Sequence, residues 1–198
     1  MLFKKLFLAI ALVFSCSFVG QASFAINYLS PSEFYIAGVQ PGMYASAVLQ
    51  SFGEPTKRYV GDNIPTRGGP MLKHTNKEIW FYKGLGLVMT DVFDYPTNYG
   101  HRVMLVLVTD RSATTAAGLA VGDSIDQMVK LYGNPLYASS SWGNKEVVES
   151  FGPKPFIYDH YYTYRINTNS TTEWNDWKNI NVYTYEGYIS AICLYTGF

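Results

Sequence analysis

The sequence is poor in charged residues. Only 15% of its 198 residues are charged, against ~25% in ordinary globular proteins, and the 15 basic residues equal the 15 acidic ones. A protein held to nucleic acid by electrostatics carries a basic excess, so this class of function is excluded. The aromatic content of 17% also excludes a disordered chain, because disordered chains have few aromatic residues. We therefore expect one or two folded domains.

Cysteine and histidine are scarce as well, with two and three residues. Cys16 lies in a segment that we expect to be removed, and Cys193 alone cannot form an internal disulfide. His74, His101 and His160 are far apart and belong to no HxxxH or Cys/His pair, so we expect no metal site. Cys193 stands in an apolar run, where a thiol is a small hydrophobic group and a poor nucleophile.

The sequence offers only weak candidates for catalytic residues. Asp159 and His160 are adjacent on a predicted strand, where their side chains would point to opposite faces and could not act as an acid–base pair. No convergent nucleophile, base and oxyanion donor is visible. We expect neither enzyme activity nor a cofactor.

Residues 1–25 have the pattern of a secretory signal peptide. Lys4 and Lys5 form its positive start, Leu6–Phe14 is an unbroken apolar run, and Ala22–Ala25 has small residues at the positions that precede a cleavage site. The apolar run is too short to span the ~30 Å core of a bilayer as a helix. We expect cleavage at the end of this segment and an exported protein, located in a bacterial cell envelope or outside the cell.

A second interpretation of this segment concerns Cys16. Residues 13–16 read VFSC and loosely resemble a lipoprotein box, in which a lipidated cysteine becomes the new N-terminus. Phe14 is large where such a box has a small residue, so ordinary cleavage is the preferred interpretation. The mature protein would contact a membrane only if Cys16 were lipidated.

The sequence contains an internal duplication with an offset of 80 residues. Residues 38–55 read GVQPGMYASAVLQSFGEP, and residues 118–135 read GLAVGDSIDQMVKLYGNP. The shared glycines and prolines are Gly38, Gly42, Gly53 and Pro55 in the first segment, and Gly118, Gly122, Gly133 and Pro135 in the second. Two segments that match at one fixed offset indicate two homologous units.

Each of these segments predicts a helix with one apolar stripe. The stripe consists of Ala45, Val48, Leu49 and Phe52 in the first unit, and of Ile125, Met128, Val129 and Tyr132 in the second. A glycine with left-handed φ closes each predicted helix, and a proline follows. Ser124 and Gln127 predict a capping box in the second unit, whereas Tyr44 offers no such cap in the first.

Strand-forming residues follow each predicted helix. The predicted strands are Lys57–Val60, Glu78–Lys83, Leu85–Phe93 and Arg102–Thr109 in the first unit, and Leu136–Ser140, Ile157–Ile166, Asn179–Tyr185 and Tyr188–Tyr195 in the second. Glu186-Gly187 is short enough for a tight hairpin. Each unit thus predicts an α+β fold, in which a short helix packs on one face of a roughly four-stranded antiparallel sheet. We expect two such small sheets, in a first repeat over 26–112 and a second over 113–198.

The repeated pattern resembles a known family. The pattern G-(V/L)-x-x-G-x5-(V/M)-x4-G-x-P is followed by Trp80 and Tyr82, or by His160 and Tyr162, and then by Gly-x-x-Val or Gly-x-Ile before a final strand. This order is similar to that of the SmpA/OmlA family of small envelope lipoproteins, which share a fold with the β-lactamase inhibitory protein. A tandem pair of such units covers about residues 30–196. The resemblance implies an inhibitor-like fold that binds other proteins through an open sheet face.

Aromatic residues are densest in the second unit. We take five of them as candidate partner-binding residues: Tyr161, Tyr162, Tyr164, Trp174 and Trp177. Strand alternation puts Tyr158, His160, Tyr162 and Tyr164 on one face, and Tyr161, Thr163 and Arg165 on the other. Which face points inward stays open, and part of the patch is expected to be core.

Two functions fit this sequence. The first is a non-enzymatic module of the cell envelope that binds another envelope or extracellular protein, because tyrosine and tryptophan supply large contact areas. The alternative is a cell-wall or glycan-binding module, since aromatic faces also stack on sugar rings.

Overall fold

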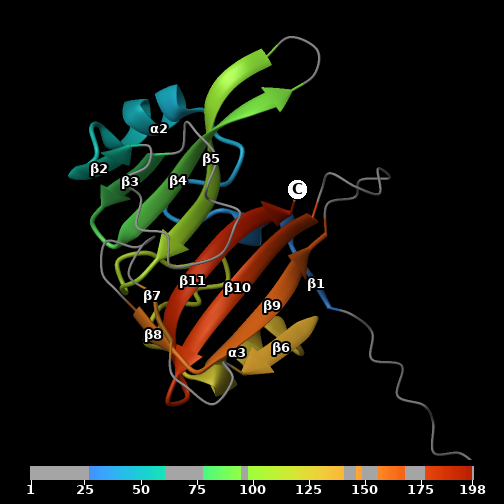
Figure 1. Ribbon diagram of the computed structural model, residues 1–198. Helices are drawn as coiled ribbons and strands as arrows, with labels where there is room; N and C mark the ends of the chain where they lie inside the picture. Colours follow the sequence, from blue (N-terminus) through green and yellow to red (C-terminus); the bar gives the residue numbers. More distant parts are fainter. Residues whose placement is uncertain are drawn as a thin grey trace, which may run out of the picture.

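The computed structural model describes residues 27–60, 78–94, 98–140, 146–148, 156–167 and 177–197 (Figure 1). Its elements are, in chain order, β1 (Tyr28–Leu29), η1 (Pro31–Phe34), α2 (Ala45–Phe52), β2 (Lys57–Val60), β3 (Glu78–Tyr82), β4 (Leu85–Asp94), β5 (Asn98–Val108), α3 (Ile125–Tyr132), β6 (Tyr137–Ser140), β7 (Glu146–Val148), β8 (Phe156–Tyr158), β9 (His160–Ile166), β10 (Trp177–Tyr185) and β11 (Tyr188–Gly197). The predicted signal peptide, Cys16, His74 and Trp174 lie outside the described residues.

Nine of the described strands form one large sheet, and β7 and β8 form a separate two-stranded sheet. The order of the large sheet is β1-β9-β10-β11-β5-β4-β3-β2, and β6 pairs with β9 beside β1. Strands β5 and β11 join the two halves of the sheet through antiparallel pairs that run from Val108–Ile192 to Leu105–Tyr195. The prediction of two small sheets is therefore wrong, because the last strand of each half pairs with the other and leaves no free edge between them. The fold is a mixed α/β fold with a nine-stranded sheet.

The predicted strands are found nearly at the predicted residues. There are two main differences. Asp159 is a bend that divides the predicted strand Ile157–Ile166 into β8 and β9, and β5 begins at Asn98, four residues before the predicted start at Arg102. The predicted hairpin at Glu186-Gly187 is confirmed: both residues have positive φ, and Tyr185 pairs with Tyr188. The short strands β1 and β7 were not predicted.

Both predicted helices are present, and they begin and end 80 residues apart. Val48 in α2 and Met128 in α3 are completely buried in one hydrophobic core, which places both helices on the same face of the sheet. Val129 departs from the predicted stripe, because 40% of its surface is exposed.

The helix ends follow the sequence prediction in most respects. The Gln127 backbone N–H donates to the Ser124 hydroxyl at 3.2 Å, while Tyr44 makes no side-chain cap. Gly53 and Gly133 have φ of 71° and 72°, positive as predicted. Their ψ values of −162° and −153° are not those of the predicted left-handed turn, but of an extended region open only to glycine.

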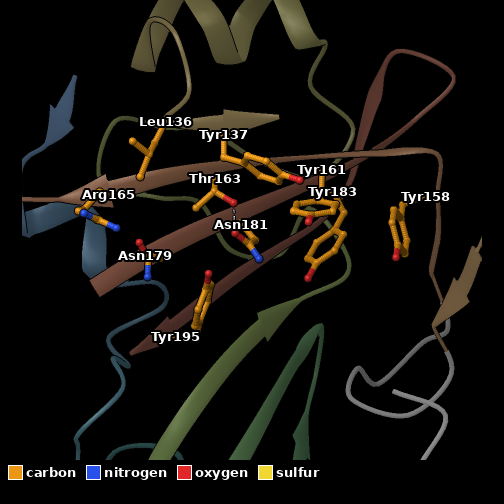
Figure 2. Close-up of a pocket in the computed structure, with 10 residues that line it drawn as sticks. All are labelled: Leu136, Tyr137, Tyr158, Tyr161, Thr163, Arg165, Asn179, Asn181, Tyr183 and Tyr195. Atoms are coloured by element: carbon orange, nitrogen blue, oxygen red, sulfur yellow. Dashed lines mark hydrogen bonds between the residues drawn. The ribbon is translucent and has the colours of Figure 1, made fainter. Parts of the chain in front are cut away.

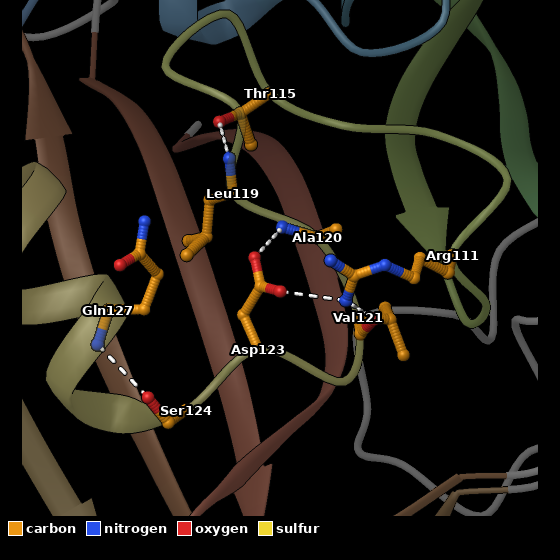
Figure 3. Close-up of polar contacts among 8 residues, drawn as sticks. All are labelled: Arg111, Thr115, Leu119, Ala120, Val121, Asp123, Ser124 and Gln127. Atoms are coloured by element: carbon orange, nitrogen blue, oxygen red, sulfur yellow. Dashed lines mark hydrogen bonds and ion pairs between the residues drawn. The ribbon is translucent and has the colours of Figure 1, made fainter.

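Polar contacts fix the segment between the two halves (Figure 3). The Arg111 guanidinium lies 2.7 Å from a carboxylate oxygen of Asp123, and the other oxygen of Asp123 accepts from the Ala120 backbone N–H at 2.9 Å. The Thr115 hydroxyl accepts from the Leu119 backbone N–H at 3.2 Å. The segment between the two halves is therefore an ordered turn that leads into α3.

The N-terminal segment lies on the second half of the sheet, although the sequence assigns it to the first repeat. Strand β1 pairs in parallel with β9, through Tyr28–Arg165 and Leu29–Ile166. Glu33 is buried, and its carboxylate accepts a 2.6 Å hydrogen bond from the Tyr132 hydroxyl. Residues 28–36 thus tie the start of the chain to α3 and β9.

The sheet face opposite the helices is only partly open. On the first half, Ile79, Phe81 and Val88 form a separate buried cluster there. At the centre, Phe156 of β8 covers Leu107, Ala191 and Cys193. Val103–Val108 of β5 is apolar at every position because this part of the strand has buried residues on both faces of the sheet. A hollow remains over the second half.

Among the residues that the structure describes, none of the helices is long and apolar enough to cross a membrane.

Candidate functional site

A hollow with a volume of about 460 Å³ lies on the sheet face opposite the helices (Figure 2). We call it the tyrosine hollow. Its lining residues come from β6, β8, β9, β10, β11 and the turn before β6: Leu136, Tyr137, Tyr158, Tyr161, Thr163, Arg165, Asn179, Asn181, Tyr183 and Tyr195. The volume is within the ~300–1,000 Å³ that is usual for ligand sites.

Strand register brings the central lining residues together. Tyr161, Thr163 and Arg165 of β9 pair directly with Tyr183, Asn181 and Asn179 of β10. Alternate residues of a strand share a face, so these three pairs form two adjacent rows on one side of the sheet. The bend at Asp159 resets this alternation, which lets Tyr158 of β8 reach the same side as Tyr161.

The tyrosine rings contact one another. Tyr161 lies 6.0 Å from Tyr183 and 5.9 Å from Tyr137, measured between ring centroids. Tyr158 meets Tyr183 edge-on at 5.1 Å. Such tilted and edge-to-face arrangements are favourable for aromatic pairs and hold the rings in place. Tyr137 is 53% exposed and forms the outer wall of the hollow.

Asn181 lies at the centre of the polar contacts. Its side-chain oxygen accepts a 2.7 Å hydrogen bond from the Thr163 hydroxyl. Burial raises the pKa of Tyr183 and of Tyr195, and hydrogen bonding to Asn181 opposes that rise in both. Both tyrosines therefore keep their hydroxyl protons at neutral pH and can donate hydrogen bonds.

Arg165 is the one charged side chain among the ten lining residues. The Arg165 cation acts on Tyr195 across the hollow, where it opposes the rise in pKa that burial causes. Figure 2 shows Arg165, Asn179 and Leu136 at one end, Tyr158 at the other, and Tyr137, Tyr161 and Tyr183 between them. The hollow is thus cationic and amide-rich at one end and aromatic at the other.

The sequence-predicted site residues lie in different places. Tyr161 is in the hollow. Tyr162 is half-buried and packs against the core on the helix side, and Tyr164 is completely buried there. Tyr164 is therefore a core residue and offers no surface to a partner. Trp177 begins β10, but its side chain, like the whole of Trp174, lies outside the described residues.

The sequence-based interpretation missed four tyrosines of the hollow: Tyr137, Tyr158, Tyr183 and Tyr195. The available signal was the predicted hairpin at Glu186-Gly187. The register of β10 and β11, counted from that hairpin, places Tyr183 and Tyr195 near Asn181. Tyr158 could not be found in this way, because alternation alone put it on the face opposite Tyr161.

No family model, curated protein or solved structure matches this chain. The described residues also hold no group of three or more side chains suited to a metal ion.

Asp159 and His160 do touch, contrary to the prediction. The imidazole Nδ1 of His160 lies 3.0 Å from a carboxylate oxygen of Asp159, because Asp159 sits in a bend and not in a regular strand. Burial raises the pKa of Asp159, but hydrogen bonds from His160 and the Glu186 backbone N–H outweigh it and leave the pKa lowered. The second bond, at 3.0 Å, ties this carboxylate to the Glu186-Gly187 hairpin.

Cys193 is a buried thiol, as predicted. Its sulfur packs with Leu107, Phe156 and Ala191 beneath β8. Burial raises its pKa to about 12, so the thiolate needed for nucleophilic chemistry is scarce at neutral pH.

Proposed function

We propose that this protein is a non-enzymatic, exported module of the bacterial cell envelope that binds another protein through the tyrosine hollow. The observation that carries the proposal is the composition of the hollow: five tyrosines and an arginine, with no lysine, aspartate or glutamate. The cores of protein interfaces are enriched in tyrosine and arginine and depleted in lysine and acidic residues. The rings are already held by one another, so little conformational entropy is lost on binding.

We further propose that the chain consists of two homologous units similar to the SmpA/OmlA family and the β-lactamase inhibitory protein. Matching hydrogen bonds in the two halves support this. The Gly42 backbone N–H donates to the Val103 carbonyl at 2.7 Å, and that of Gly122 donates to the Ile189 carbonyl at 2.8 Å. In each half a glycine before the helix is thus anchored to a long strand of the sheet.

Protein capture from envelope extracts tests the binding function. The purified chain should retain one or more specific proteins, and Tyr137→Ala should release them, because this half-exposed ring is the outer wall of the hollow. Tyr188→Ala is the matched control: Tyr188 is 60% exposed in the same half, outside the hollow. Equal capture by both variants would reject the hollow as the binding surface.

The alternative is a glycan-binding module. The observation that favours it is the half-exposed Tyr137 ring above a row of amides, since sugar rings stack on tyrosine and bind side-chain amides. Sedimentation with purified peptidoglycan distinguishes the two functions. Retention on the glycan, with no protein captured from extract, would replace the first proposal with this one.

Export is tested separately by determining the N-terminus of the protein recovered from cells. A mature chain that begins at Ile26 is the expected result. A lipidated chain that begins at Cys16 would show the membrane-anchored alternative, and an uncleaved chain in the cytoplasm would exclude export.

A further inference from the structure

We infer that the tyrosine hollow binds a proline-rich segment of its partner in the polyproline II conformation. The tyrosine rings pack against the prolines, and the hydroxyls of Tyr183 and Tyr195 donate hydrogen bonds to carbonyl groups of the segment. This inference rests on the proposed protein-binding function and specifies the chemistry of the partner.

Asn181 determines which hydrogen bonds the floor of the hollow can offer. Its side-chain oxygen accepts a 2.7 Å hydrogen bond from the Thr163 hydroxyl, and its amide N–H groups donate to the hydroxyls of Tyr183 and Tyr195. The sheet register brings these groups together: Tyr183 is two residues along β10, and Tyr195 is two residues along β11 from Cys193, the residue opposite Asn181. Figure 2 shows Asn181 between the two tyrosines. The amide is thus fully used within the hollow.

The two tyrosine hydroxyls are the donors that remain. A phenol oxygen that accepts from Asn181 directs its own proton elsewhere, and burial keeps that proton in place at neutral pH by raising the pKa of both tyrosines. Arg165 and Asn179 also line the hollow, but both have interactions of their own, so neither is counted as available. The ten lining residues include no carboxylate. A matching partner therefore brings acceptors and few donors.

A proline-rich segment has this complement of polar groups. Proline has no backbone N–H, and a polyproline II helix makes no internal hydrogen bonds, so its carbonyl groups stay available at a rise of ~3.1 Å per residue. Two hydroxyls bonded to one amide nitrogen are ~5 Å apart, which is within reach of carbonyls on neighbouring residues. An added β-strand would bring N–H groups and would pair at a sheet edge, whereas the hollow lies on a sheet face.

The tyrosines form a row whose length suits such a helix. In the order of the adjacent strands β6, β9, β10 and β11, the row consists of Tyr137, Tyr161, Tyr183 and Tyr195. Neighbouring strands are ~4.8 Å apart, so the row is ~14 Å long. A polyproline II helix covers this length in about four to five residues, and its residues i and i+3 face the same side. Two prolines at that spacing can therefore contact the row together.

The rings are arranged to receive prolines at little entropic cost. Tyr161 lies 5.9 Å from Tyr137 and 6.0 Å from Tyr183 between ring centroids, so the rings hold one another in place. Tyr137 is 53% exposed, which leaves part of its ring for a ligand. Grooves lined by aromatic rings bind polyproline II segments because these segments already have the bound conformation.

The test is selection of random peptides about twelve residues long, which exceed the length of the row, displayed on phage and selected against the full chain. The expected peptides carry prolines at positions i and i+3. Tyr183→Phe and Tyr195→Phe should each weaken their binding by about 2- to 10-fold, because each variant removes one hydrogen-bond donor and keeps the ring.

Tyr188→Phe is the matched control for the loss of a hydroxyl. Tyr188 is 60% exposed in the same half and lies outside the hollow, so this variant should bind the selected peptides as the parent protein does. Urea denaturation confirms that each variant folds, and if Tyr183→Phe does not fold, Tyr195→Phe alone decides. Equal binding by the parent protein and the folded variants of the hollow would overturn the inference.

The remaining outcomes separate the inference from the proposed function. Selected peptides that depend on Tyr137 but carry no such pair of prolines would overturn the inference and leave the protein-binding function standing. The same holds if envelope proteins are captured but no peptide is selected, because the partner would then present a folded surface. Binding to peptidoglycan alone would overturn both.

Discussion

The hydroxyl of Tyr164 donates a 3.2 Å hydrogen bond to the carbonyl oxygen of Gly133, the residue that closes helix α3. Tyr82 makes the same bond, at 3.0 Å, to Gly53 at the end of α2. In both halves a tyrosine from the sheet thus satisfies a carbonyl group at the end of the helix packed on it. Such carbonyls have no partner within their helix and need one from elsewhere.

We expect Tyr164→Phe to lower the free energy of unfolding by about 0.5–1.5 kcal/mol, because it removes this hydrogen bond and keeps the ring. Tyr82→Phe should have an effect of the same size, measured by urea denaturation. Tyr164→Phe should also leave partner capture unchanged, since the side chain is buried. A loss of capture without a loss of stability would return Tyr164 to the binding site.

The glycines at the helix ends give a second prediction. Gly53 and Gly133 share a backbone conformation that is nearly exclusive to glycine, so alanine at either position should cost about 1–3 kcal/mol. A Cβ at Gly53 meets nothing within 4 Å, whereas one at Gly133 meets only the end of the exposed Asn27 side chain, which can rotate away. Gly53→Ala and Gly133→Ala should therefore have similar midpoints in urea denaturation. A clearly lower midpoint for Gly133→Ala that Asn27→Ala restores would contradict this expectation.

The local elements could be predicted from the sequence because their determinants are local. The apolar stripe and the closing glycine define α2 and α3 within eighteen residues each, and the β2 bounds follow from the residues after Pro55. The joining of the sheets could not be predicted. It depends on the pairing of Val108 in β5 with Ile192 in β11. Because β5 has apolar residues on both faces, its sequence does not indicate which strand lies beside it.

The tyrosine hollow was only partly predictable for a related reason. Strand β9 reads HYYTYRI, with aromatic or polar side chains on both faces, so its pattern does not identify the inner side. The inner face is the one that carries Tyr164. Helix α3 packs on that face, and the Gly133 carbonyl accepts a hydrogen bond from the Tyr164 hydroxyl. Tyr161 lines the hollow, whereas the position of Tyr158 depends on the bend at Asp159.

The carboxylate of Glu78 leads to a prediction on acid stability. Burial raises its pKa, but hydrogen bonds from Arg58 and the Trp80 indole N–H, at 2.5–2.7 Å, outweigh this and leave the pKa lowered. A carboxyl whose pKa is lowered by folding stabilises the protein above its unfolded pKa of about 4.3, and this contribution is lost as the pH falls through the folded value.

Glu78→Gln should therefore flatten the loss of stability between about pH 5 and pH 3, measured by urea denaturation across that range. Arg58→Gln should raise the pKa of Glu78 and shift the loss to higher pH. Parallel acid profiles for the parent protein and Glu78→Gln would show that this carboxylate does not contribute.

The thiol of Cys193 should resist modification in the native protein. With a pKa of about 12 and 4% exposure, it presents almost no thiolate at pH 8. In a Cys16→Ser chain, a thiol reagent should react at pH 8 only as fast as the protein unfolds, and completely in denaturant. Rapid reaction of the native protein would indicate that β8 does not cover this part of the sheet.

Two adjacent residues of the N-terminal segment, Phe34 and Tyr35, should differ in how much their substitution destabilises the protein. Phe34 is 1% exposed and belongs to the core, whereas Tyr35 is 43% exposed. Phe34→Ala should lower the free energy of unfolding by about 3–5 kcal/mol, since it removes a buried ring and leaves a cavity. Tyr35→Ala should change it by no more than about 0.5 kcal/mol. Urea denaturation of the two variants measures whether this segment is structural.

If Phe34→Ala is strongly destabilising and Tyr35→Ala is not, the N-terminal segment is part of the fold. The position of signal-peptide cleavage should then affect stability. Strand β1 begins at Tyr28, only three residues after the predicted cleavage site at Ala25, and it pairs with β9 at the edge of the sheet. Cleavage at Ala25 leaves that strand whole, whereas cleavage a few residues later would remove the residues that lie opposite Arg165 and Ile166, and with them the Leu29 carbonyl that accepts from the Asn167 backbone N–H at 2.9 Å. A chain that begins at Pro31 should therefore be less stable than one that begins at Ile26, because β9 loses its neighbour. If both have the same unfolding midpoint, β1 contributes nothing to the fold, and the core begins at Phe34.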